Sequence, residues 1–406
     1  MKQYKLLFSI YLSILLIFIV FFLASVHNSP VNNSMAEWVI NYQGGFTRRG
    51  FLGEVIFQVS QIFNFQLRKS FLILQILIYI GYFLSIYIFF KKINQNYLFT
   101  LAIFSPLFFI FSLAELEALG RKDILMFLVF INNFLIYFKY KNLNYNYVYF
   151  FLTFPIVFLT HEIFIIYIGY FLAFFIILEK KINYVFFIKF FLTIFFIIFF
   201  LDLVISNQFT KEDLDLLCKN LKEKSNENCG LAPHSMISNI SSYKSEVGWQ
   251  LPHVIRYILI FIFGFLALIV SIFYSKINNS NTNILVSKVN LKIIFFFLVL
   301  PSILPFLTAV DSGRYMSMAY TFPCIFYFGL LHVKVIAFDY DRVNLIISKT
   351  IFRLKKYRVI LLIILCFTWT PKAVYHEDIG SFPIYRTIIK TPNFMENFRY
   401  FKINQL

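Results

Sequence analysis

Four short polar segments interrupt the long apolar stretches of this chain, and each carries side chains that can take part in chemistry. They are "NYQGGFTRRGFLGE" (41–54), "ELEALGRKD" (115–123), "LTHEIF" (159–164) and "AVDSGRYMS" (309–317). Arginine guanidinium groups match phosphate oxygens through two parallel hydrogen bonds. A carboxylate or a histidine nearby can accept a proton from a hydroxyl group. Together the four segments contain arginines that could bind a phosphate and bases that could accept a proton. These are the groups needed for a transfer reaction on a phosphorylated substrate.

The first polar segment places Arg48 and Arg49 a few residues after the pair Gly44–Gly45. Adjacent glycines permit a tight turn, and such a turn would aim backbone N–H groups and both guanidinium groups at one anion. Residues 51–65 alternate apolar and polar positions, which favours a short helix lying in the membrane interface. The alternative is that the two arginines only extend to the lipid headgroups.

The second and fourth segments each contain an arginine close to an acid. Arg121 and Asp123 flank a single lysine, and together these residues could form a salt-bridged cap that binds no ligand. Asp311 and Arg314 are spaced so that they could pair on one helical turn. Gly313 lies between them and favours a bend in the backbone instead.

The third segment joins two apolar runs that are both shorter than the ~20 residues a membrane-crossing helix needs. His161 and Glu162 therefore lie at or below the depth of the lipid headgroups. Ionisable side chains at that depth are costly unless they are compensated, so function is the default hypothesis for them. A polar hairpin tip with satisfied hydrogen bonds is the alternative.

The rest of the chain has the composition of a multi-spanning membrane protein. Of its 406 residues 60% are hydrophobic, including 57 Phe and 26 Tyr, and the mean hydropathy is +0.74. This leaves too little polar surface for a soluble domain of that length. We expect an all-α polytopic membrane protein, a single membrane domain over residues 1–406, with about eleven transmembrane helices. Their expected limits are 6–26, 71–90, 97–114, 124–138, 147–160, 163–178, 184–206, 252–274, 293–310, 316–333 and 359–370.

The placement of lysines predicts the orientation of these spans. Every second connection is basic, from Lys2 and Lys5 at the start to residues 334–358 near the end, and short cytoplasmic loops carry an excess of Lys and Arg. The N-terminus is therefore expected in the cytoplasm and the C-terminus outside. The formal net charge of +17 becomes a signal of topology rather than of nucleic-acid binding. All four polar segments then face the outer side.

Two outer connections are long, residues 27–70 and residues 207–251. The second contains Cys218 and Cys229, which could pair in an oxidising compartment or remain free thiols. Tryptophans are enriched at membrane interfaces, and the three in this chain fall at the expected outer boundary: Trp38, Trp249 and Trp369.

No nucleotide-binding or zinc-binding pattern occurs in the sequence, which lacks a P-loop, a dinucleotide fingerprint, an HExxH motif and a Cys/His metal spacing. We therefore expect no cofactor and no metal, so the energy for a transfer must come with the substrate. A sugar activated by a polyprenyl diphosphate meets this requirement. Arginines would stabilise its leaving group, and a nearby base would deprotonate the attacking hydroxyl.

In its length, number of expected spans, cytoplasmic N-terminus, enlarged outer loop and outer-face arginines, the chain resembles the Wzy-type O-antigen polymerases of Gram-negative bacteria. The resemblance implies a glycosyltransferase of the bacterial inner membrane, in contact with membrane lipids and with its active site facing the periplasm. Its substrate would be undecaprenyl-diphosphate-linked repeat units, which it joins into O-antigen or a related surface polysaccharide for lipopolysaccharide biosynthesis. A chain-length regulator is a further partner that the family suggests.

The resemblance also assigns roles to residues of the polar segments. It makes Arg48, Arg49 and Arg314 candidates to hold the diphosphate, with Arg121 in reserve. We rank Glu162 first as the catalytic base, then Asp311, then His161. The loop 207–251 departs from the family's arginine-bearing outer loops because it contains lysines and no arginine.

Three other functions fit parts of the sequence. Glycosyltransferases of the GT-C fold also have a long first outer loop with an interfacial helix and an acidic catalytic residue, and residues 27–70 match this outline with Glu37 or Glu54 as the acid. Their donor would be a polyprenyl monophosphate sugar. Some of these enzymes need a divalent metal, for which Glu37, Glu115 and Asp123 are the available ligands, although no spacing identifies a site. A lipid-oligosaccharide flippase is the second alternative. It would be expected to show internal repeats and charges near the midplane of the bilayer, whereas the charges of this chain gather at one face. A membrane O-acyltransferase would rely on His161.

Overall fold

The protein is described from a computed structural model that covers residues 2–27, 33–93, 96–115, 117–180, 182–234, 236–237, 251–278, 289–308, 311–343 and 358–372. Helices make up most of these residues. Within them a single short antiparallel sheet pairs β1 (Ser275–Ile277) with β2 (Ile336–Phe338), and Lys276 lies opposite Ala337. The prediction of a mostly helical fold is confirmed.

Six helices are long and apolar enough to cross a membrane, which indicates a membrane protein. They correspond to six of the eleven expected spans. They are α1 (Lys2–Val26), α4 (Leu67–Phe90), α7 (Asp123–Tyr140), α8 (Leu143–Thr160), α10 (Tyr184–Ser206) and α14 (Leu251–Phe273).

The other expected spans are short, interrupted or less apolar. Pro106 and Pro301 lie near the points where two of them break, since proline lacks the N–H group that a helical hydrogen bond needs. The resulting pieces are α5 (Tyr97–Ile103) and α6 (Phe111–Ala114), then α16 (Leu291–Val299), η3 (Leu300–Ile303) and α17 (Leu304–Thr308). The remaining segments are η1 (Glu162–Tyr167), α9 (Ile168–Leu178), α18 (Ser312–His332) and α20 (Arg358–Phe367).

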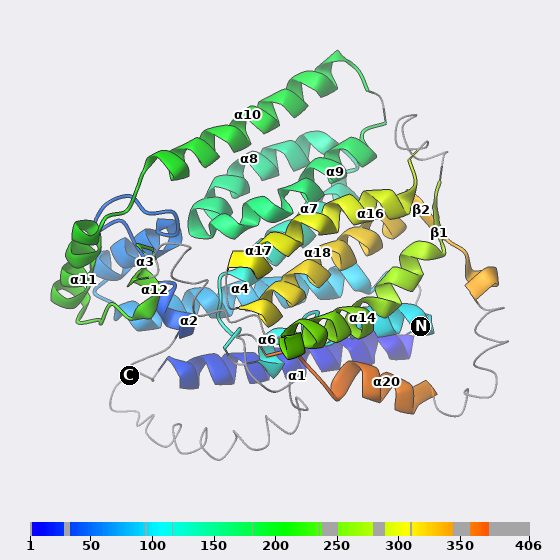
Figure 1. The fold of residues 1–406 in the computed structure, drawn as a ribbon, viewed down its shortest axis with the longest axis horizontal. Helices are drawn as coiled ribbons and strands as arrows, with labels where there is room; N and C mark the ends of the chain where they lie inside the picture. The colour runs from blue at the N-terminus through cyan, green and yellow to red at the C-terminus, as the bar shows by residue number, and fades with distance from the viewer. Residues whose placement is uncertain are drawn as a thin grey trace.

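The long helices lie side by side, and the shorter connecting helices gather at one end of the bundle (Figure 1). These connecting helices are α2 (Asn33–Ala36), α3 (Phe51–Ile62), α11 (Lys211–Ser225) and α12 (Leu231–His234). The N-terminus and the connection between α9 and α10 lie at the opposite end, beside β1 and β2 (Figure 1). The N-terminus and the helices around the first polar segment are thus at different ends of the bundle.

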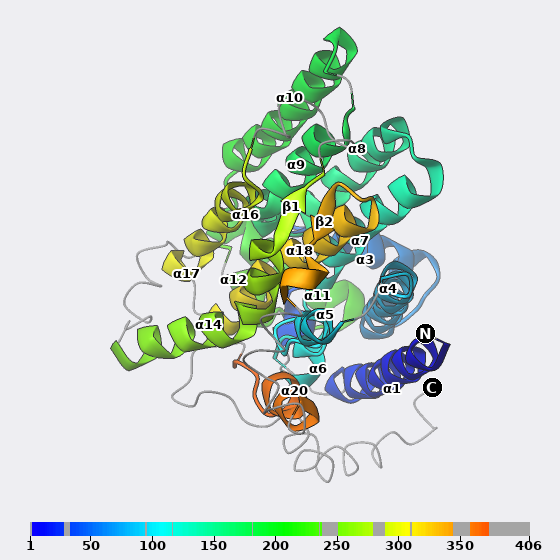
Figure 2. The same cartoon turned by 90° about the vertical axis from the view of Figure 1, so that its right-hand side faces the viewer.

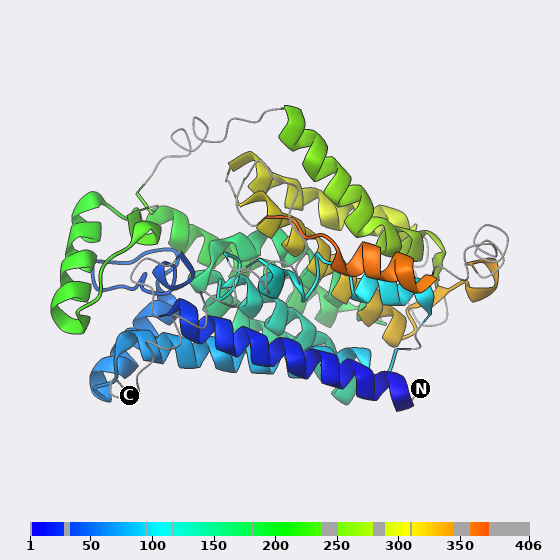
Figure 3. The ribbon, with the colours of Figure 1, turned by 90° about the horizontal axis from the view of Figure 1, so that it is seen from below.

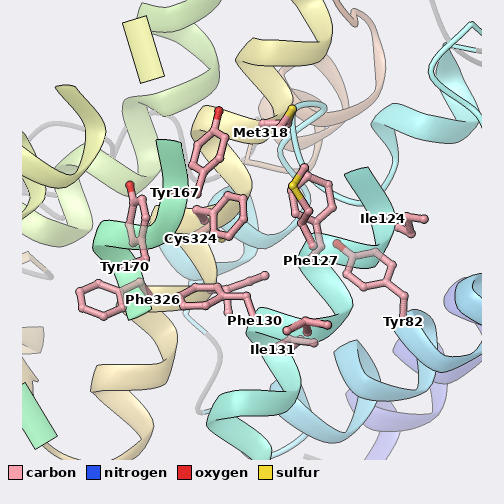
Figure 4. Close-up of a cluster of buried hydrophobic side chains, with 14 of the residues drawn as sticks. Tyr82, Ile124, Phe127, Phe130, Ile131, Tyr167, Tyr170, Met318, Cys324 and Phe326 are labelled. Atoms are coloured by element: carbon pink, nitrogen blue, oxygen red, sulfur yellow. The ribbon is translucent and has the colours of Figure 1, made fainter. Parts of the chain in front are cut away.

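Helix α18 occupies the middle of the bundle, and its residues from Ser312 to Leu330 are all buried (Figure 2). Its aromatic side chains pack against those of α7 and η1. Phe322 lies with its ring centroid 5.2 Å from that of Phe130 and stacks on Tyr167 at 4.3 Å. Figure 4 shows the aromatic region that surrounds these contacts. Burial of large rings in such arrangements contributes much of the packing energy of a core.

The outer helices present apolar side chains to the surroundings, as lipid-facing helices do. Helix α10 is the clearest case, because only 11% of the residues in its most apolar stretch are buried and Phe195 is 70% exposed. In Figure 3 helix α1 runs along the lower edge of the molecule, and α14 lies obliquely near the upper edge. Polar side chains from the four polar segments lie at the helix ends around α2 and α3.

Candidate functional site

Residues from all four polar segments meet at the end of the bundle that carries α2 and α3. Glu37 follows α2, Arg49 precedes α3, Asp123 begins α7, His161 ends α8, and Asp311 caps α18. Salt bridges and hydrogen bonds connect these helix ends into one group. We call it the ionic cluster: Glu37, Arg48, Arg49, Arg121, Lys122, Asp123, His161, Glu162, Asp311 and Arg314.

Glu37 lies at the centre of the ionic cluster and is 4% exposed. Its Oε1 atom accepts hydrogen bonds from Arg121 Nη1 at 2.5 Å and from Arg314 Nη1 at 3.3 Å. Its Oε2 atom is buried and accepts no hydrogen bond from the residues that the structure describes. Burial alone would raise the pKa of Glu37, but the positive charges of Arg121 and Arg314 outweigh it and hold this pKa well below its usual range.

Arg314 connects the acids of three different segments. Its Nη2 atom donates to Asp123 Oδ1 at 2.8 Å, its Nε atom donates to Asp123 Oδ2, and its Nη1 atom donates to Asp311 Oδ2 at 3.0 Å and to Glu37. Asp311 and Arg314 therefore do pair on one helical turn, although the arginine also bridges to Asp123 of α7 and to Glu37 after α2. A self-contained cap in either segment does not describe these contacts.

The same guanidinium group determines the protonation of His161. Arg314 Nη2 lies 2.8 Å from His161 Nε2. A guanidinium group can only donate, so Nε2 accepts and the imidazole is neutral with its proton on Nδ1. That nitrogen is 3.6 Å from Glu162 Oε2. Burial lowers the pKa of His161, which is consistent with the neutral form.

Glu162 is held by the arginines of the first polar segment. Arg49 donates to it from Nε at 2.7 Å and from Nη2 at 2.6 Å, and Arg48 Nε lies 3.4 Å away. This two-pronged contact engages both carboxylate oxygens. Arg48 is the outermost cation of the ionic cluster, with a side chain that is 43% exposed, against 22% for Arg49.

Lys122 is the most deeply buried cation of the ionic cluster, at 1% exposed. Its Nζ atom donates to the backbone oxygen of Arg49 at 2.8 Å and lies 5.7 Å from the ring centroid of Trp38. No salt bridge to a described carboxylate occurs within 4.0 Å. Burial is the main cause that lowers the pKa of Lys122 to about 7.

The turn before Arg121 is fixed by a set of buried hydrogen bonds. The oxygen of Gly120 accepts from Trp38 Nε1 at 2.6 Å and from Gln75 Nε2 at 3.0 Å, and the nitrogen of Gly120 donates to Tyr79 Oη at 3.1 Å. Gly120 has φ +75°, a backbone conformation that favours glycine. Trp38 is fully buried within the protein, so its indole ring packs on this turn rather than facing lipid.

The glycine pair of the first segment forms the expected turn, in which the nitrogen of Gly45 donates to the oxygen of Tyr42 at 3.1 Å. Its role is to admit helix α11. A Cβ atom on Gly44 would lie 1.9 Å from the backbone oxygen of Asp213. Gly45 has φ +138°. The pair therefore serves close packing, and the arginines that follow it turn toward Glu162.

Helix α3 has the character expected of the interfacial helix over residues 51–65. It buries Gly53, Phe57 and Ser60 against the bundle and exposes Val55 and Ile62. Glu54 lies on α3 outside the ionic cluster. Its carboxylate accepts from Tyr42 N at 3.0 Å and from Gln43 Nε2 at 2.8 Å, so it fixes the turn.

The large outer loop packs on the first one. Cys218 and Cys229 form a disulfide, so the predicted pairing is confirmed. The sulfur atoms lie near His234, but sulfurs that are bonded to each other are not thiolate ligands for a metal. Glu227 accepts from Arg68 Nε at 2.8 Å. Residues 238–250 of the predicted loop 207–251, including Trp249, lie outside the described residues.

A small cavity of about 30 Å³ borders the ionic cluster on its inner side. Arg121, Asp123 and Arg314 line one wall, and Tyr82 and Phe127 line another. This volume is enough for a water molecule and much too small for a sugar. A ligand of that size would have to approach from the outer side, where Arg48, Asp311 and Glu162 are partly exposed.

The structure brings together every residue that the sequence placed in the site: Arg48, Arg49, Arg121, His161, Glu162, Asp311 and Arg314. Sequence reasoning did not place Lys122 among the site residues, and it named Asp123 only as an available metal ligand in the GT-C alternative, although both belong to the second polar segment. It also missed Gln75 and Tyr79, for which the signal was a polar side chain within an apolar span. No family model, curated protein or solved structure matches the chain.

Proposed function

We propose that this protein is a membrane glycosyltransferase whose donor is a sugar carried on a polyprenyl phosphate or diphosphate. One observation carries the proposal: arginines and carboxylates from four distant segments converge on a single buried cluster. Independent structural caps do not account for this, because Glu37 pairs with Arg121 and Asp123 pairs with Arg314 across segments. Buried ion pairs are costly and are weak evidence for stability alone.

The outer side of the ionic cluster suits a phosphate group. Arg48 and Arg49 lie there with part of their side chains exposed, and each guanidinium group has five N–H donors in a planar fork. Arg49 can therefore hold Glu162 and still donate to an oxygen of the substrate. Charged donors at this position would stabilise the leaving phosphate or diphosphate as its bond to the sugar breaks.

Glu37 is the best placed proton acceptor among the carboxylates of the ionic cluster. Its Oε2 atom has no hydrogen bond from a described residue, whereas Glu162 is engaged by arginines on both oxygens. We therefore rank Glu37 above Glu162 as the base and keep Asp311, which binds Arg314 through Oδ2 alone, and His161 as the next candidates. Its low pKa makes it a weak base while Arg121 and Arg314 bind it. Loss of either arginine contact during the reaction would raise the pKa of Glu37 and strengthen it as a base.

Two forms of this activity differ in the donor. In the first, an O-antigen polymerase of the Wzy type joins undecaprenyl-diphosphate-linked repeat units at the outer face of the inner membrane, as the architecture suggests. In the second, a GT-C transferase adds one sugar from a polyprenyl monophosphate. The position of Glu37 favours the second form, because this acid lies in the connection between α1 and α4 that also contains the amphipathic helix α3.

Surface glycan from cells with and without the gene tests both forms. Lipopolysaccharide that loses its ladder and keeps only core plus one repeat unit would support the polymerase. A ladder with an altered mass per repeat would support the single-sugar transferase. An unchanged ladder with unchanged repeat mass would contradict the proposed function.

A further inference from the structure

The ionic cluster holds one more positive charge than its acids can compensate. Its cations are Arg48, Arg49, Arg121, Lys122 and Arg314, and its carboxylates are Glu37, Asp123, Glu162 and Asp311. His161 is neutral because its Nε2 atom accepts from Arg314. The ionic cluster therefore has five cations and four carboxylates. If each carboxylate pairs with an arginine, the lysine has no carboxylate as its partner.

Lys122 is that lysine. Each of the four acids contacts an arginine, whereas the ammonium of Lys122 donates to a neutral backbone oxygen, that of Arg49, at 2.8 Å. An ammonium group has three N–H donors, so two remain for other acceptors. Removing an uncompensated ammonium group from water is strongly unfavourable. The lowered pKa of Lys122 is a consequence of the same burial.

We propose that the ionic cluster binds one phosphate group and that Lys122 supplies the positive charge which this phosphate neutralises. The identification of the phosphate as that of the lipid-linked donor rests on the proposed function. Lys122 is then a substrate-binding residue, placed directly beneath the backbone of Arg49 and beside Arg121 in the sequence.

The geometry places this lysine where such a group would arrive. Its ammonium contacts the backbone of Arg49, whose side chain and that of Arg48 form the exposed side of the ionic cluster. Arg49 acts electrostatically on the ammonium of Lys122, so an anion bound by its guanidinium group would attract that ammonium. The carboxylates around it are already paired with arginines, so an added anion meets a net positive site rather than a neutral one.

Replacement of Lys122 by methionine distinguishes a structural role of this lysine from a role in phosphate binding. If its bond to the oxygen of Arg49 mainly holds α7 to the first polar segment, then Lys122→Met lowers the thermal stability of the protein. If the charge serves a ligand, the substitution removes an uncompensated buried charge while an apolar chain of similar length fills the space. The unliganded variant is then at least as stable as the wild type.

The test uses thermal unfolding of the purified full-length protein in an uncharged detergent. Farnesyl phosphate is the probe for an isoprenoid monoester, phosphatidylglycerol is the probe for a bilayer headgroup, and sodium chloride of equal ionic strength is the reference. The variants are Lys122→Met, Lys122→Gln and the control Lys219→Met. Lys219 lies on α11, where its side chain is 67% exposed and 4.0 Å from Glu223.

We expect farnesyl phosphate to raise the melting temperature of the wild type and of Lys219→Met. Both Lys122 variants should bind it at least tenfold more weakly and should melt, without ligand, no lower than the wild type. A shift with farnesyl phosphate that exceeds that with phosphatidylglycerol would support the donor phosphate as the ligand.

Three results would overturn the proposal: no shift for the wild type, an equal shift for the Lys122 variants, or lower stability of these variants without ligand. An equal or larger shift with phosphatidylglycerol would overturn the assignment to the donor and leave a headgroup site. Glycan synthesis is measured separately in cells. Normal glycan together with unaltered phosphate binding in Lys122→Met would reject the role of Lys122 and leave the proposed function standing.

Discussion

Helices α7 and α18 contribute to two buried regions of opposite chemistry. In the middle of the bundle Phe130 of α7 packs against Phe322 and Phe326 of α18. At the first turns of the same helices, Asp123 forms a salt bridge with Arg314. The aromatic region is explained by close van der Waals and ring packing between helices. The ionic cluster is not, because desolvating each ion costs several kcal/mol and apolar replacements are often as stable. The difference between the two regions is the reason to assign function to the ionic cluster.

The largest effect is expected from Arg314→Ala, which leaves Asp123, Asp311 and Glu37 without their shared cation. Loss of one partner of a buried ion pair costs about 3–5 kcal/mol, so the free energy of unfolding should fall by that amount. Chemical denaturation of the purified protein measures it. A change below about 1 kcal/mol would mean that the acids are hydrated or protonated, and it would contradict a tightly paired cluster.

Gly44→Ala tests whether the glycine pair serves packing or anion binding. The added methyl group would meet the backbone oxygen of Asp213 at 1.9 Å, and overpacking of this kind costs about 1–3 kcal/mol. We expect a lower melting temperature and unchanged binding of farnesyl phosphate. Weakened phosphate binding at unchanged stability would instead support the anion-binding turn.

Phe130→Leu provides the matching substitution in the aromatic region. Phe130 is fully buried among rings of α7, α9 and α18, and loss of part of its volume should cost about 1–2 kcal/mol. The folded fraction should retain its glycan product in cells. Loss of product at normal protein level would show that the aromatic region takes part in function and would remove the contrast between the two regions.

A pH dependence of stability is expected to arise from Lys122. Its pKa in the folded protein is about 7, below its ordinary value of 10.5, so between these pH values the unfolded chain binds more protons and stability rises with pH. From pH 7 to 9 the wild type should therefore gain stability relative to Lys122→Met. The groups that act on this amine are Glu37, Arg49, Glu162 and Arg314. Parallel stability curves for the two proteins would contradict the uncompensated charge.

The sequence was enough to predict the members of the site because their charges break an apolar pattern. It did not predict their partners. Asp123 pairs with Arg314 rather than with Arg121, and Glu162 pairs with Arg49, because pairing depends on how the helix ends pack.

The fold was predictable to a similar extent. Long apolar runs identified six helices that are long enough to cross a membrane. The breaks near Pro106 and Pro301 had a visible cause in the sequence, since proline ends or distorts a helix. The burial of Trp38 had none, because it depends on a hydrogen bond to Gly120, which lies far along the chain.

The most direct test of the central claim is the surface glycan of cells that carry Glu37→Gln, compared with cells that carry Glu54→Gln. Glutamine keeps the size of the side chain and removes its ability to accept a proton, a change that should slow the reaction by about 10²–10⁴-fold. At equal protein levels we predict loss of the product with Glu37→Gln and normal product with Glu54→Gln. Normal product with Glu37→Gln would contradict the assignment of the ionic cluster as the site of glycosyl transfer through this base.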